Sequence, residues 1–302
     1  MNRRTERARL SFDDLPPLPP LIHPDAPGYA ARALQRSRDA QAERPTALDL
    51  RYGDDYWQKL DIYLARERVR EALPILAFLH GGAWSNGCKE WMGFMAPPVV
   101  ELPALFVAVS YRRAPDAAIE QQAEDCAAAL AWIWRNAASY GGDPNRIFLG
   151  GHSAGGHLAS LATLRADLRR AQGLPEDVVK GCFPVSAAFD LRESANSAPA
   201  RWKRIAAAIG RHGDATALSP ILHVAGNTTP FVLAWGEADF PEIARQGRAM
   251  AAALRAQPGE VDAVELTGLS HFDASARAGD AQFEWTRRVR ARLAGAAITR
   301  VA

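Results

Sequence analysis

Residues 146–159 read Arg-Ile-Phe-Leu-Gly-Gly-His-Ser-Ala-Gly-Gly-His-Leu-Ala, and this stretch decides the fold. An apolar run meets a glycine-rich turn, which leads into small helix-forming residues. The pattern G-x-S-x-G stands within it, centred on Ser153. A serine on a sharp strand-to-helix turn has a strained backbone, and glycines two residues before and after it remove side chains that would collide. The stretch therefore predicts that Ser153 projects from the end of a sheet at a helix N-terminus.

Short apolar or β-branched runs predict eight strands, at 47–52, 58–64, 74–79, 104–110, 146–150, 181–187, 230–235 and 261–266. From the third run onward, segments with helical spacing fall between most of the strands. This alternation favours an α/β architecture, with a mostly parallel sheet and helices on both faces. The first two runs have no helix between them and predict an antiparallel hairpin. The clearest helical pattern spans 120–138, and the glycines after it predict its end.

Two segments fall outside this alternation. Residues 1–45 contain a proline-rich run at 15–20 and a short helical pattern at about 28–41, and they predict an N-terminal arm. Residues 46–302 predict a single domain, interrupted by an excursion at about 190–218. We expect the arm and the excursion together to form a small cap.

Composition limits the classes of partner. The 302 residues carry 36 Lys and Arg against 34 Asp and Glu, a formal charge of +2, which gives no electrostatic case for nucleic acid. No run is long enough to cross a membrane, and the basic N-terminus lacks the apolar run of a signal peptide. The cysteines, Cys88, Cys126 and Cys182, are interpreted as buried thiols. A cytoplasmic protein that contacts neither nucleic acid nor membrane is expected.

A second glycine-rich turn follows the strand predicted at 74–79. It reads His80-Gly81-Gly82-Ala83-Trp84, and such a loop can direct backbone N–H groups toward an oxygen that becomes negative during acyl transfer. We expect the donors of this oxyanion hole to be Gly82 and Ala83, together with Ala154 after the serine. His80 is interpreted as a residue that orients the backbone, with a catalytic role as the alternative.

A serine on such a turn can act as a nucleophile when an acid and then a histidine follow it in the chain, each after a strand. Asp239 follows the strand at 230–235, and His271 follows the strand at 261–266. Glu237 competes with Asp239 as the acid, but Asp239 stands nearer to Pro241, where a helix can start. The sequence therefore predicts a triad of Ser153, Asp239 and His271. The remaining histidines are interpreted as packing or surface residues: His23, His152, His157, His212 and His223.

With these residues in place, the chain from about 45 to 295 resembles the α/β-hydrolase superfamily. The resemblance is to the branch that holds hormone-sensitive-lipase-like carboxylesterases and kynurenine formamidases. Esterases of that branch typically carry His-Gly-Gly-Gly, whereas residues 80–84 look like the formamidase form, His-Gly-Gly-x-Trp. Leu60-Asp61-Ile62-Tyr63 and Ser270-His271-Phe272 also look like family segments. The resemblance implies an α/β-hydrolase fold, with Ser153 as nucleophile, Asp239 as acid and His271 as base.

The resemblance implies mechanism more firmly than substrate, because esters and activated amides share one machinery. A serine hydrolase of small carboxylic esters is the first hypothesis and an aryl formamidase the second. A receptor without catalysis is a third, although such a protein is expected to lack a member of the triad. No cofactor or metal is required, and the oligomeric state stays open. Aromatic residues that could line a substrate pocket, or pack in the core, are Trp84, Trp91, Phe94 and Phe240, with Met95 beside them.

Overall fold

The computed structural model describes residue 12 and residues 15–65, 71–192 and 199–295. Eight strands form one sheet, at the positions that the sequence predicts. They are β1 (Thr46–Arg51), β2 (Lys59–Tyr63), β3 (Leu73–Leu79), β4 (Leu105–Val109), β5 (Gly142–His152), β6 (Val179–Val185), β7 (Phe231–Ala238) and β8 (Val261–Ser270).

The strand order is β1-β2-β4-β3-β5-β6-β7-β8. Strands β1 and β2 pair antiparallel, which confirms the predicted hairpin, and β2 pairs antiparallel with β4. All other neighbours are parallel, as the alternation predicts. The carboxyl ends of the six parallel strands therefore meet at one edge of the sheet, where ligands bind in open α/β sheets.

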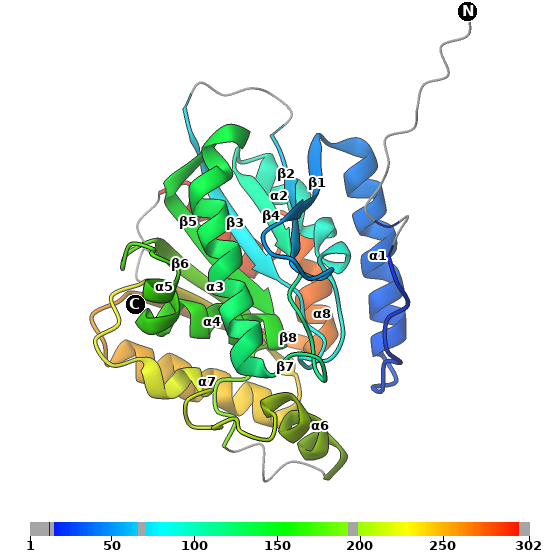
Figure 1. Cartoon of the computed structure of the whole chain (residues 1–302), viewed down its shortest axis with the longest axis vertical. Helices are drawn as coiled ribbons and strands as arrows, with labels where there is room; N and C mark the ends of the chain where they lie inside the picture. Colours follow the sequence, from blue (N-terminus) through cyan, green and yellow to red (C-terminus); the bar gives the residue numbers. More distant parts are fainter. Residues whose placement is uncertain (1–11, 13–14, 66–70, 193–198, 296–302) are drawn as a thin grey trace, which may run out of the picture.

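Helices cover both faces of the sheet (Figure 1). Side chains alternate along the strands: Ile75 and Ala77 pack on one face, and Leu76 and Phe78 on the other. The first face is covered by α3 (Ile119–Asn136), α4 (Ala154–Leu164), α5 (Ala166–Ala171) and α7 (Pro241–Arg255). The second is covered by α1 (Ala26–Glu43), α2 (Ala96–Val100), α8 (His271–Ala276) and α9 (Glu284–Leu293).

Element boundaries differ from the prediction most at the end of helix α3, along strand β5, which begins at Gly142 rather than at about 146, and at the ends of strands β7 and β8. Helix α3 ends at Asn136, and a short 3₁₀ turn at Ala137–Tyr140 leads to Gly141, whose φ of +83° turns the chain into β5. Strands β7 and β8 run to Ala238 and Ser270, several residues beyond the predicted ends. They extend because their ends pair with each other.

The predicted arm and excursion are only partly within the described residues. Residues 1–11 and 13–14 of the arm and 193–198 of the excursion lie outside them. Residues 15–22 have no regular secondary structure, and the helical pattern at 28–41 forms part of α1. Helix α6 (Pro199–Ile209) forms within the excursion. Of the helices described, none combines the length and apolar character needed to cross a membrane.

Candidate active site

Ser153 stands on a strained turn between β5 and α4. Its φ of +53° lies in the left-handed region, where a residue with a side chain is uncommon. A Cβ on Gly151 would lie 2.3 Å from the backbone of Gly155, and a Cβ on Gly155 would lie 2.2 Å from the carbonyl oxygen of Leu79. Only glycine fits at either position. The two glycines thus allow α4 to begin directly against the ends of β5 and β3.

Sheet register brings the predicted acid and base together. Ala238 of β7 pairs with Ser270 of β8, so the next residues, Asp239 and His271, leave the sheet side by side. His271 Nδ1 lies 2.8 Å from Asp239 Oδ1, and its Nε2 lies 3.0 Å from Ser153 Oγ. Because the carboxylate accepts a hydrogen bond from Nδ1–H, Nε2 is left to accept one from the serine hydroxyl. The three residues form a continuous hydrogen-bonded chain.

The structure separates Asp239 from its competitor Glu237. Glu237 is exposed at the end of β7, and its carboxylate accepts a hydrogen bond from the Gly268 amide at 2.8 Å. Asp239 is buried and also accepts from the amide of Phe240 at 2.7 Å. Burial would raise the pKa of Asp239, but the hydrogen bonds from His271 and Phe240 outweigh burial and hold the pKa below its usual value. Asp239 is therefore ionised next to the imidazole.

The turn after β3 brings backbone N–H groups to the cavity. Gly82, Ala83 and Trp84 have consecutive positive φ values of +132°, +52° and +59°. In the part of the chain that the structure describes, no protein acceptor pairs with the N–H groups of Gly82, Ala83 and Ala154. All three residues line the same cavity as Ser153. Backbone donors beside a serine hydroxyl suit an oxygen that gains negative charge.

His80 supports this turn rather than facing the cavity. Its Nδ1 lies 2.8 Å from the carbonyl oxygen of Gly81, and its ring stacks on Tyr111 with centroids 4.2 Å apart. Burial lowers the pKa of His80 to about 3, so the ring stays neutral. The contacts agree with the interpretation of His80 as a residue that orients the backbone.

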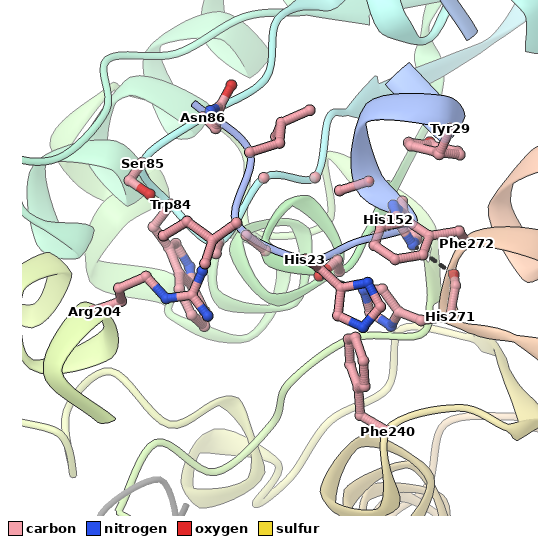
Figure 2. A pocket seen from close by; sticks show the side chains of 18 of the residues that line it. His23, Tyr29, Trp84, Ser85, Asn86, His152, Arg204, Phe240, His271 and Phe272 are labelled. Atoms are coloured by element: carbon pink, nitrogen blue, oxygen red, sulfur yellow. Dashed lines mark hydrogen bonds between the residues drawn. The ribbon is translucent and has the colours of Figure 1, made fainter. Parts of the chain in front are cut away.

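His152 also contacts the site, although the sequence analysis interprets it as a packing or surface residue. Its Nε2 lies 3.0 Å from the backbone carbonyl oxygen of His271 (dashed in Figure 2), and the two rings are 4.8 Å apart. Burial lowers the pKa of His152 to about 3. The neutral His152 ring therefore holds the backbone from which His271 reaches Ser153. Its position directly before the serine is the one signal that could have indicated this contact.

A cavity of about 300 Å³ opens above these residues (Figure 2). Trp84, Trp91 and Phe240 line it, as expected for a pocket. Phe94 and Met95 are not among the lining residues. Phe94 lies beneath the guanidinium of Arg36, 4.5 Å away, and is buried on the α1 side of the sheet. Phe94 and Met95 therefore follow the alternative of core packing, because both side chains of the 3₁₀ turn that carries them are buried.

The N-terminal segment contributes residues that the sequence gave no reason to choose. Residues 20–23, Ala26 and Tyr29 line the cavity. The His23 ring lies 5.2 Å from that of Phe240 and 5.3 Å from that of Phe272. Since His23 stands in irregular chain, no periodicity or strand end could have singled it out.

No group of three His, Cys, Asp or Glu side chains suited to a metal ion occurs among the described residues.

Comparison with known proteins agrees with this architecture. Esterase B from Lactobacillus rhamnosis superposes with a TM-score of 0.71 at 20% identity, covering 90% of this chain and 97% of that one. The chain thus has the α/β-hydrolase fold. The BD-FAE family matches residues 60–254, more than half of the chain, and the chain belongs to that family.

Two curated relatives indicate the branch of the superfamily to which the chain is similar. Esterase LipC from Mycobacterium tuberculosis is 32% identical over 239 residues, 74% of this chain and 59% of that protein. Kynurenine formamidase from Salmo salar is 27% identical over 242 residues, 80% of each. These matches confirm the predicted branch of carboxylesterases and kynurenine formamidases. The chain spans 28% to 59% of the length of several curated esterase relatives that it matches.

Proposed function

We propose that this protein hydrolyses small carboxylic esters through an acyl-enzyme. The observation that carries the proposal is the chain of hydrogen bonds from Asp239 through His271 to Ser153, at 2.8 Å and 3.0 Å. It ends in a cavity beside backbone N–H groups that have no acceptor among the described residues. A nucleophile next to a base that is itself held by an acid is the arrangement that acyl transfer needs.

In this scheme Ser153 Oγ attacks the ester carbonyl carbon and its proton passes to His271 Nε2. The carbonyl oxygen becomes negative and accepts hydrogen bonds from Gly82, Ala83 and Ala154. The C–O bond to the alcohol then breaks, and His271 returns the proton to the leaving oxygen. Water repeats the sequence on the acyl-enzyme, releasing the carboxylic acid and restoring Ser153. Asp239 stabilises the imidazolium in both halves.

An aryl formamidase is the second candidate. Two observations favour it: Trp84 of the His-Gly-Gly-x-Trp loop lines the cavity, and the match to the Salmo salar formamidase extends over 80% of both chains. A formamide passes through the same tetrahedral oxyanion, so the machinery alone does not separate the two substrates. The cavity volume of about 300 Å³ lies at the lower end of the range for small-molecule sites, which favours a small acyl group.

A kinetic panel tests the proposal. Short p-nitrophenyl esters, longer esters and an aryl formamide are supplied to the purified protein, and kcat/KM is measured for each. We expect the short esters to give the highest value, and a serine-directed organophosphonate to abolish turnover with one label on Ser153. A higher kcat/KM for the formamide would favour the second candidate. Absence of turnover on every substrate, or a label elsewhere, would contradict both.

A further inference from the structure

Among the described residues that line the cavity, one side chain carries a permanent charge, that of Arg204 on α6. No Asp, Glu or Lys is among its lining residues in the described part of the chain. Of the histidines that line it, His152 is kept neutral by burial, which lowers its pKa to about 3. A guanidinium is protonated at every physiological pH. The fixed charge facing a bound substrate therefore comes from Arg204.

The packing of α6 explains why Arg204 faces the cavity. Ile205, Ala208 and Ile209 are buried and form the apolar stripe by which the helix packs on the domain. Arg204 lies at the edge of this stripe and is half-buried, whereas its neighbour Lys203 is exposed. In Figure 2 the Arg204 side chain extends toward Trp84. These two residues lie on the left of the view, and His271 and Phe240 lie on the right.

Arg204 has no counter-ion within the part of the chain that the structure describes. No hydrogen bond or ion pair joins it to another group there. Two other partly buried arginines are paired with carboxylates: Arg165 with Glu120 at 2.6 Å, and Arg112 with Asp125 at 2.7 Å. A guanidinium that has lost part of its water beside an apolar wall is stabilised when an anion binds to it.

We propose that Arg204 binds a carboxylate on the non-reacting end of the substrate, so that esters carrying a second, anionic group are preferred. The planar guanidinium can donate two parallel hydrogen bonds to a carboxylate. The reacting carbonyl would then lie at Ser153, with the charged end held near Trp84. This inference rests on the proposed function, since it names the substrate class of the same site.

Two matched pairs of esters test it. The first is the p-nitrophenyl ester of glutaric acid with its free carboxylate, against the same compound with that carboxylate methylated. The second is 3-acetoxybenzoate against its methyl ester, which moves the charge to the leaving group. For each pair we take the ratio of kcat/KM for the anionic ester to kcat/KM for the neutral ester. We expect Arg204→Gln to lower this ratio about tenfold in at least one pair, mainly through a higher KM for the anionic ester. Arg204→Lys should restore part of the ratio.

Lys203→Gln is the matched control, because it removes the same charge from the same helix without changing the cavity. The inference is overturned if the ratio stays within about twofold in both pairs, or if Lys203→Gln shifts it equally, which would indicate only a general field effect.

Binding of benzoate and of benzamide, measured by NMR titration, tests the anion site without requiring that any ester is hydrolysed. If no neutral ester is hydrolysed but benzoate binding weakens in Arg204→Gln more than benzamide binding, the proposed function fails and the anion site stands. If benzoate and benzamide are affected equally, the anion site fails.

Discussion

The floor and the roof of the cavity are built differently. We define the floor as Ser153, Asp239, His271 and the turn at 80–84, and the roof as residues 20–29 with α6. Each floor residue follows the end of a parallel strand, and paired positions such as Ala238 and Ser270 fix its place. Roof residues come from irregular chain, the first turn of α1 and helix α6, which pack through side chains. The floor suits chemistry that requires fixed geometry, and the roof suits the choice of substrate.

The largest effect expected of a floor variant is that of Ser153→Ala. The serine backbone bonds to Val185 and His157 do not involve its hydroxyl, so the protein should fold normally. Loss of the nucleophile should reduce kcat by about 10⁶-fold, the order seen when a triad nucleophile is removed. Esterase kinetics and a thermal unfolding curve on the same preparation check this. Substantial turnover by the folded variant would contradict the role of Ser153.

Asp239→Asn is expected to have the next largest effect. The amide has nearly the same shape but cannot stabilise the imidazolium, and it favours the wrong tautomer of His271, so kcat should fall by roughly 10⁴-fold. Glu237→Gln is the matched control because its carboxylate bonds the Gly268 amide and does not reach His271. It should stay within about tenfold of the parent, as an exposed charge contributes little. The reverse order of the two variants would mean that Glu237 is the acid.

Sequence alone predicts the floor far better than the roof. G-x-S-x-G requires a specific backbone, and the clashes at Gly151 and Gly155 show why. Strand ends could be placed within a few residues, and the position of Asp239 just ahead of Pro241 favoured it over Glu237 as the predicted acid. Arg204 and His23 gave no comparable signal, because tertiary packing rather than local pattern brings them to the cavity. Phe94 illustrates the same limit. An aromatic residue close to the site in the sequence can either pack in the core or line the pocket, and the sequence does not distinguish the two.

His23→Ala tests whether the roof affects binding rather than chemistry. The imidazole contacts Phe240 and Phe272 at the cavity wall, and an aromatic pair contributes about 0.5–1.5 kcal/mol. We expect KM for a short ester to rise up to about tenfold while kcat changes little. His212→Ala, at an exposed histidine, is the control and should leave both parameters unchanged. A fall in kcat of about 10³-fold with KM unchanged would place His23 among the reacting groups.

Tyr29→Phe should give the smallest effect, and it tests whether the Tyr29 hydrogen bond stabilises the packing of the roof on the domain. The Tyr29 hydroxyl is buried and lies 2.8 Å from Ser275 Oγ on α8. Burial raises the pKa of Tyr29 to about 12, so the hydroxyl stays protonated and can donate. Removing one buried hydrogen bond should lower the free energy of unfolding by about 1 kcal/mol.

The matched control for this variant is Tyr140→Phe, whose hydroxyl has no hydrogen-bond partner among the described residues. It should leave the unfolding midpoint unchanged, whereas Tyr29→Phe should lower it by about 2–4 °C in a domain of this size. Because Tyr29 fastens the roof and does not touch the reacting atoms in this scheme, kcat/KM should change by less than about threefold. Calorimetry and ester kinetics on both variants measure the two effects separately. A fall in kcat/KM of more than about a hundredfold at unchanged stability would show that a roof hydroxyl takes part in the reaction, and the division between floor and roof would then be wrong.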